Sequence, residues 1–143
     1  MESAGLAGLI LWTFAQLGAP DLALPTIRIV PAESLRAAFV AENGRAAMSG
    51  HEIAALYRPH ENAILLPESF DPADPSDRAL LVHEAVHAVQ YQSGRAAQVR
   101  CPGQLEDQAY AIQARWLRQQ GRPAEAGRVR VLGAFLSVCA RPD

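Results

Sequence analysis

The segment His83-Glu84-Ala85-Val86-His87 constrains the fold more than any other feature of the sequence. Residues four apart on an α-helix lie one above the other, so both imidazoles can bind one metal ion if the segment is helical. Glu84 then lies beside the metal, where a carboxylate can deprotonate a bound water. The spacing predicts a zinc-binding helix. The alternative, a pair of core histidines, would cost about 1–3 kcal/mol for each imidazole buried without a partner.

The sequence around this motif predicts the bounds of the helix and of two that follow. Asp74 is a suitable N-cap and Pro75 a suitable first helical residue, while Gly94 can end the helix. Further helices are expected over about residues 104–120 and 123–139, separated by a glycine and a proline. The C-terminal half is therefore expected to consist of three helices.

The N-terminal half is expected to contain a helix and a small sheet. An apolar helix is predicted within residues 1–20, and a shorter helix over 32–42. Strands are predicted over 24–30, 53–58 and 62–66, the last two forming a hairpin. The apolar run at the N-terminus is shorter than the roughly 20 residues that span a bilayer. We therefore expect no membrane association, although an apolar N-terminus leaves it open.

This order of elements predicts an α+β fold. We expect one domain over residues 1–143, a compact unit in which a small three-stranded sheet packs with about five helices. The sheet region would cover residues 24–70 and the metal-site helices residues 75–140.

A catalytic zinc ion usually has three protein ligands and one open position, so two histidines need a third partner. Glu106, on the following predicted helix, fits this role, since the small Ala109 lets that helix approach closely. Asp107 is the competing ligand, but it points about 100° away around the helix. Cys101 is a candidate fourth ligand, which would instead indicate a closed, structural site.

These motifs resemble those of the gluzincins, and in particular of minigluzincins and small bacterial zincin-like domains. The matching residues are Leu81, Val82, His83, Glu84, Val86, His87 and Gln90, followed by Glu106, Ala109 and Tyr110. The resemblance covers about residues 50 to 120. It implies Zn²⁺ at His83, His87 and Glu106, with Glu84 as the base. Many gluzincins carry an aspartate four residues after the ligand glutamate to orient the first histidine, whereas this chain has Tyr110 there.

The function expected from these residues is zinc-dependent hydrolysis of a peptide or protein substrate, that is, a metallopeptidase. Glu84 would take a proton from a zinc-bound water and pass it to the leaving amine. Tyr110 and Tyr91 are candidate donors to the developing oxyanion, although packing would also explain each of them. The strand at Asn62–Leu66 is expected to pair with an extended substrate. One alternative is a catalytically silent zinc-binding regulatory or interaction module. The other is a structural protein in which zinc only holds the helices together.

Charge and cysteine usage restrict the partners and the compartment. The arginines between Arg115 and Arg130 are expected to form a solvated helix face, and without interleaved aromatic residues we expect no nucleic-acid partner. His51 and His60 are expected at the surface, with His60 able to face the cleft. A bridge between Cys101 and Cys139 would favour a periplasmic or secreted protein over a cytoplasmic one, and two free thiols are the alternative. Oligomeric state is not predicted.

Overall fold

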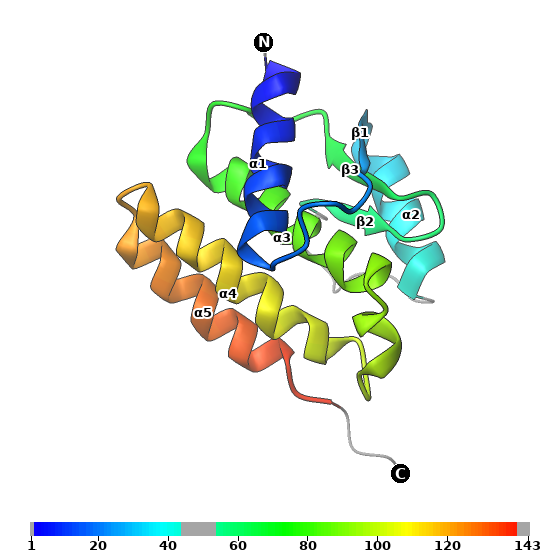
Figure 1. Ribbon diagram of the computed structural model, residues 1–143. Helices are drawn as coiled ribbons and strands as arrows, with labels where there is room; N and C mark the ends of the chain where they lie inside the picture. The colour runs from blue at the N-terminus through cyan, green and yellow to red at the C-terminus, as the bar shows by residue number, and fades with distance from the viewer. Residues whose placement is uncertain (1, 44–53, 140–143) are drawn as a thin grey trace.

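The protein is built around one long helix packed against a small sheet (Figure 1). The structure is a computed structural model that describes residues 2–43 and 54–139. In chain order its elements are α1 (Glu2–Gln16), β1 (Thr26–Val30), α2 (Ala32–Asn43), β2 (Leu56–Arg58), β3 (Ala63–Pro67), α3 (Pro75–Gln92), the 3₁₀ turn η1 (Arg95–Gln98), α4 (Gly103–Gln119) and α5 (Pro123–Leu136). The prediction of an α+β fold with a small three-stranded sheet is confirmed.

The sheet is mixed, with strand order β1-β3-β2. β3 pairs in parallel with β1 and antiparallel with β2, in the register Thr26↔Ala63 and Tyr57↔Ile64. Residues 63–66 of β3 are all buried, which is typical of a central strand with apolar contacts on both faces. Among the described residues, the outer strands of the sheet are therefore β1 and β2.

This topology corrects one sequence-based prediction. Asn62–Leu66 was expected to pair with an extended substrate, but most of that segment is β3, and both of its edges are already occupied. β3 lies between the two other strands because its residues from Ala63 to Leu66 are all apolar, and a strand buried on both faces belongs in the middle of a sheet. A substrate strand could add only at an outer edge.

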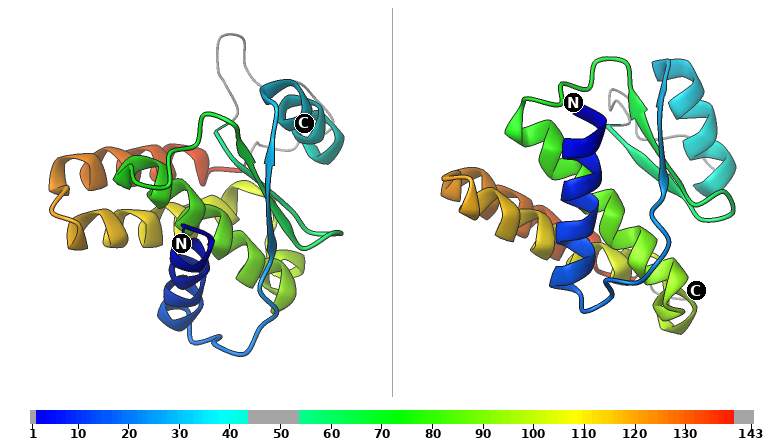
Figure 2. Two further views of the ribbon diagram at one scale, coloured as in Figure 1. Left: turned by 90° about the horizontal axis from the view of Figure 1, so that it is seen from above. Right: turned by 45° about the horizontal axis from the view of Figure 1, so that its top comes forward.

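The two faces of the sheet bury separate cores. Leu65 points to α2, where it packs with the buried Leu35 and Ala38. Ile64 and Leu66 point to the larger core formed with α1, α3 and α4. Figure 2 shows α2 on one side of the sheet and the remaining helices on the other. None of the described helices is long and apolar enough to cross a membrane.

Helix α3 begins and ends where the sequence predicts. The Asp74 side chain accepts a hydrogen bond from the Asp77 backbone N–H, and Pro75 is the first helical residue. Gly94 follows the helix with a φ of 87°, a conformation that favours glycine. Every residue from 81 to 90 is buried, because α1, α4 and the sheet surround the helix. The two histidines are thus held on the most enclosed element of the fold.

Helices α4 and α5 form an antiparallel hairpin whose close packing depends on two glycines. A Cβ atom at Gly133 would lie 2.6 Å from the Tyr110 Cβ, and one at Gly103 would lie 2.5 Å from the Leu136 carbonyl oxygen. A disulfide joins Cys101, just before α4, to Cys139, just after α5, with a Cα–Cα distance of 5.8 Å. A bridge that closes a loop of this length lowers the conformational entropy of the unfolded chain. It thereby stabilises the folded state by about 4 kcal/mol.

Several predicted bounds differ slightly from the structure. β2 begins at Leu56 rather than at Ile53, and Ile53 lies outside the described residues, as does His51. α5 ends at Leu136, so Cys139 follows the helix instead of closing it. The sequence left open whether the two cysteines are bridged or free, and the structure has the bridge.

Candidate metal centre

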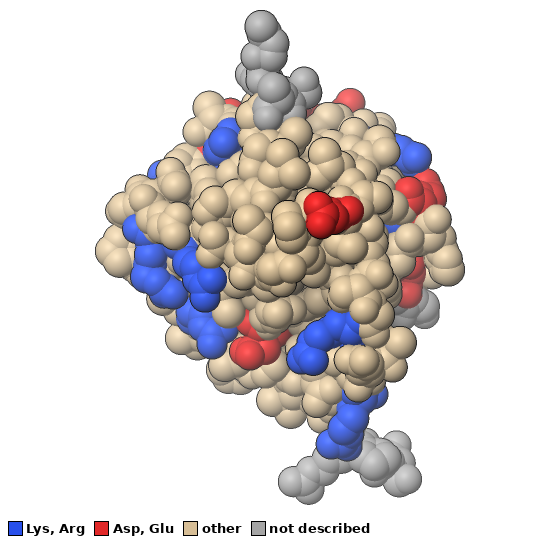
Figure 3. All heavy atoms as spheres, in the orientation of Figure 1, with Lys and Arg blue, Asp and Glu red and all other residues tan. Residues whose placement is uncertain are grey.

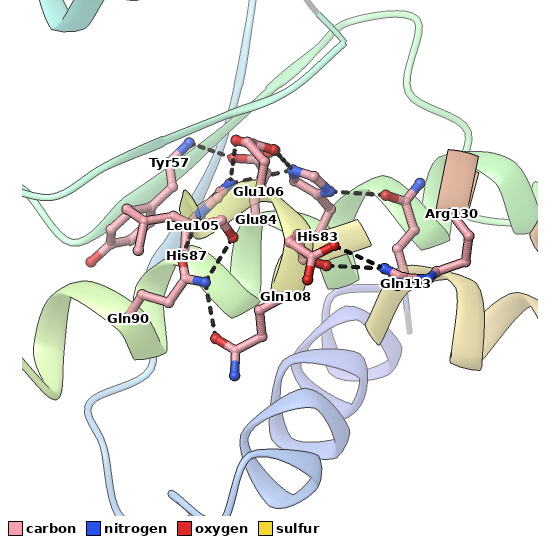
Figure 4. A network of polar contacts seen from close by, with 11 residues as sticks. Tyr57, His83, Glu84, His87, Gln90, Leu105, Glu106, Gln108, Gln113 and Arg130 are labelled. Carbon is pink, nitrogen blue, oxygen red and sulfur yellow. Dashed lines mark hydrogen bonds and ion pairs between the residues drawn. The ribbon is translucent and has the colours of Figure 1, made fainter. Parts of the chain in front are cut away.

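Three side chains from two helices converge on one point (Figure 4). The Nε2 atoms of His83 and His87, both on α3, are 3.2 Å apart. Glu106 on α4 places Oε2 3.0 Å from the His83 Nε2 and Oε1 3.0 Å from the His87 Nε2. Ligands around a tetrahedral zinc ion with bonds of about 2.0–2.1 Å are about 3.3–3.4 Å apart, so the three groups have nearly the spacing of a metal site. The structure brings together all three predicted ligands.

Gln90 fixes the orientation of the His87 ring, because two hydrogen bonds hold the Gln90 side chain in place. The His87 Nδ1 lies 2.8 Å from the Gln90 Oε1, while the Gln90 Nε2 donates to the Leu105 carbonyl oxygen at 2.9 Å and to the Gln108 Oε1 at 3.0 Å. A carbonyl oxygen can only accept, so the amide nitrogen must face Leu105 and the amide oxygen must face His87. The Nδ1 of His87 therefore carries a proton, and in the neutral ring the Nε2 presents a lone pair.

Gln113 contacts the corresponding nitrogen of His83. Its Oε1 lies 2.9 Å from the His83 Nδ1, and both side chains are buried. Gln113 follows Glu106 by seven residues, so it lies two turns further along the same face of α4. Sequence reasoning did not find this residue. The available signal was a glutamine at heptad spacing from the ligand glutamate, on a helix face that is otherwise apolar.

Two imidazole lone pairs and a carboxylate face one another and require a positive charge between them. Burial lowers the pKa of His87, but the hydrogen bond that the ring donates to Glu106 and the charges of Glu84 and Glu106 outweigh it and raise the pKa to about 9. Burial raises the pKa of Glu106, but the hydrogen bonds and charges of His83 and His87 hold it well below its usual range. In the metal-free protein a proton on His87 supplies the charge that a divalent cation would otherwise supply.

Glu84 lies beside the three converging groups but points differently. Its Oε1 accepts a hydrogen bond of 2.9 Å from the backbone N–H of Tyr57 on β2, and its Oε2 lies 4.0 Å from the His83 Nε2. His83, Glu84 and His87 also form a cluster able to hold a metal ion. Glu106 is nevertheless the better third ligand, because its oxygens are 3.0 Å from both imidazoles. The Glu106 side chain is 29% exposed, so solvent reaches the centre from that side.

The competing ligands lie elsewhere. Asp107 points out of the site, with its side chain 53% exposed and its Oδ1 3.5 Å from the Arg130 guanidinium. Cys101 cannot supply a thiolate, since its sulfur is bonded to Cys139. Neither the competing ligand Asp107 nor the candidate fourth ligand Cys101 therefore points to the centre in this structure.

Two tyrosines lie near the centre in different ways. The Tyr110 ring packs edge-on against the His83 ring, with centroids 4.3 Å apart. Burial, with the charges of Glu106 and Glu84, raises the pKa of Tyr110 to about 12, so its hydroxyl keeps its proton. Tyr91 lies one turn after His87 and packs against Tyr57, with ring centroids 5.9 Å apart. His60 is exposed in the β2–β3 turn, as predicted.

The arginine-rich surface lies on the α4–α5 hairpin, away from β2. Figure 3 shows guanidinium groups gathered at the left of the molecule, over these helices. Arg115 donates to the Gln16 Oε1, Arg122 pairs with Glu125 at 3.0 Å, and Arg130 with Asp107. These local pairings are consistent with a solvated helix face, and the absence of a nucleic-acid partner stays a prediction.

Comparison with known proteins identifies the family. The family described as a domain of unknown function (DUF6647) matches residues 5–143. The chain belongs to this family. It has no significant match among curated proteins or among solved structures. Within this DUF6647 chain, the matched region includes every residue of the centre described above.

The raised pKa of His87 predicts how the stability of the metal-free protein depends on pH. Because the folded state binds this proton more tightly than the unfolded state, the stabilisation is fully present below about pH 6.5 and is lost as the pH rises through about 9. The free energy of unfolding should fall across this window by up to about 1.4 kcal/mol per pH unit. Urea unfolding in the presence of a chelator at several pH values measures this slope.

The matched control for this prediction is Glu106→Gln, which removes the charge that holds the proton. The slope should become much shallower in this variant. A stability that does not change between pH 6.5 and 9 in the unmodified chain, or a His87 resonance that titrates at its ordinary pKa, would contradict the assignment.

Proposed function

We propose that this chain is a zinc-dependent hydrolase, a metallopeptidase of the gluzincin type. The observation that carries the proposal is the convergence of His83 Nε2, His87 Nε2 and a Glu106 carboxylate at 3.0–3.2 Å. Two glutamines fix the imidazole lone pairs toward that point, and nitrogen and carboxylate ligands suit Zn²⁺. Zinc held by these residues would polarise a substrate carbonyl and acidify a water molecule.

Glu84 is the general base in this proposal. The Tyr57 N–H holds one carboxylate oxygen at 2.9 Å, which fixes the side chain and leaves Oε2 to accept a proton from the attacking water. The same oxygen would then return the proton to the leaving amine. Tyr110, which keeps its hydroxyl proton at neutral pH, is the proposed donor to the negative charge that develops on the substrate oxygen.

The outer edge of β2 is the proposed binding edge for an extended peptide. Because the Tyr57 N–H points to Glu84, it points away from β3, and in an antiparallel strand the carbonyl of the same residue points the same way. This carbonyl can accept a hydrogen bond from a substrate backbone N–H beside the metal centre. The substrate edge thus moves from β3, where the sequence suggested it, to β2.

The Cys101–Cys139 disulfide supports an oxidising compartment for this activity, because such bonds persist in secreted and periplasmic proteins. The competing function is a zinc-binding module without catalysis, and it predicts metal binding with no turnover.

Replacing Glu84 with Gln tests the catalytic role. The variant should keep its zinc, since His83, His87 and Glu106 are unchanged, but hydrolysis of a peptide mixture should fall by at least about 10²–10⁴-fold without the base. Zinc content and the appearance of new N-termini are measured on the same preparations. Activity equal to that of the unmodified chain would remove Glu84 as base, and the lack of turnover in both proteins would favour the silent module.

Replacing Gln113 tests the orientation of His83. Gln113→Leu removes the oxygen that accepts the Nδ1 proton, so zinc affinity should fall by about 10–100-fold. Gln113→Glu retains an acceptor and should bind zinc at least as well as the unmodified chain. Competition with a chromogenic chelator measures both affinities. Equal losses in the two variants would point to disturbed packing rather than to the hydrogen bond.

A further inference from the structure

The stripe of α3 that carries the metal-site histidines continues to Tyr91. His83, His87 and Tyr91 are spaced four residues apart, so their side chains leave the same side of the helix. Tyr91 lies about 6 Å beyond His87 along the helix axis, from a rise of 1.5 Å per residue. Whereas the two histidines are buried, Tyr91 is 44% exposed.

Tyr91 borders an open hollow of about 320 Å³ at the turn between β2 and β3. Its lining residues are Tyr57, Pro59, His60, Asn62, Tyr91 and Gln92. None of these is an acid or an arginine. Tyr57 connects the hollow to the metal centre, because its backbone N–H binds Glu84 while its ring packs against that of Tyr91.

The polar groups of this hollow are largely satisfied by one another. The Asn62 Oδ1 accepts hydrogen bonds from the Tyr57 hydroxyl at 2.7 Å and from the Gln92 Nε2 at 3.3 Å. The Gln92 side chain also pairs with both the N–H and the carbonyl of Ala23. These bonds fix the floor of the hollow, and the Tyr91 ring is the aromatic surface that stays open to a ligand, since the Tyr57 ring is buried. A charged ligand group would find neither a carboxylate nor a guanidinium among the lining residues.

We propose that this hollow binds an aromatic side chain of the substrate, two residues from the scissile bond. The proposal rests on the proposed peptidase function. An extended peptide advances about 3.3 Å per residue, so the 6 Å step from His87 to Tyr91 corresponds to about two residues. Residues two apart in a strand point to the same side of it. The substrate residue that lies two positions along can therefore direct its side chain into the hollow while the substrate backbone follows the edge of β2. Tyr91 is the residue that determines this specificity.

Cleavage-site mapping tests the proposal. The zinc-loaded chain is incubated with a diverse peptide mixture, and the residues around each cut are counted. Aromatic residues should be enriched about tenfold at the second position on one side of the cut, from the apolar contact area and ring contacts that such a side chain makes. Tyr91→Ala should lose this enrichment, whereas Tyr91→Phe should keep it. Phe135→Ala, which removes an aromatic ring that is 79% exposed on α5, is the matched control and should also keep it.

A binding measurement separates this proposal from the hydrolytic one. Zinc-loaded Glu84→Gln should bind fluorescent peptides that contain an aromatic residue about tenfold more tightly than their alanine counterparts, and Glu84→Gln/Tyr91→Ala should bind both alike. Cleavage without aromatic preference, or a preference that survives Tyr91→Ala, would overturn the pocket. A Tyr91-dependent binding preference in a chain that cleaves nothing would overturn the hydrolase and leave the pocket assigned. The absence of both the preference and cleavage would overturn both.

Discussion

The mutual repulsion of three electron-rich groups, held together inside the fold, is the constraint on which the site depends. Gln90 and Gln113 each accept an Nδ1 proton, so both imidazoles direct their Nε2 lone pairs to the point where the Glu106 carboxylate arrives. A cation between them turns this repulsion into attraction. Neutral amides, rather than an aspartate, orient both imidazoles, so the charge of a bound cation would be balanced mainly by the nearby glutamates.

The rest of the architecture positions these groups. Burial on every side holds α3, and with it the two histidines, in one place. Helix α4 brings Glu106 to them, and the close contacts at Gly103 and Gly133 fix α4 against α5. The disulfide at Cys101, five residues before Glu106, ties the start of α4 to the end of α5. On the opposite side the edge of β2 holds Glu84 through a backbone N–H, which links the sheet to the proposed chemistry.

Local signals made much of this predictable from the sequence. Asp74, Pro75 and Gly94 gave the bounds of α3, and the histidine spacing with Glu106 gave the three converging side chains. Other features depend on contacts between distant segments. The position of β3 in the middle of the sheet follows from pairing with both neighbours, although its apolar run was a hint. The contact of Gln113 with His83 depends on how α4 rotates against α3, and the spacing of seven residues from Glu106 was a hint.

The most direct test of the account is the zinc content of the purified chain, compared with that of Glu106→Ala and Asp107→Ala. All three proteins are prepared without chelator, supplied with zinc and dialysed before elemental analysis. The unmodified chain and Asp107→Ala should retain about one zinc ion per molecule, as expected for a single site with three protein ligands, and Glu106→Ala should lose most of it. Equal zinc in Glu106→Ala, or no bound zinc in the unmodified chain, would contradict the account.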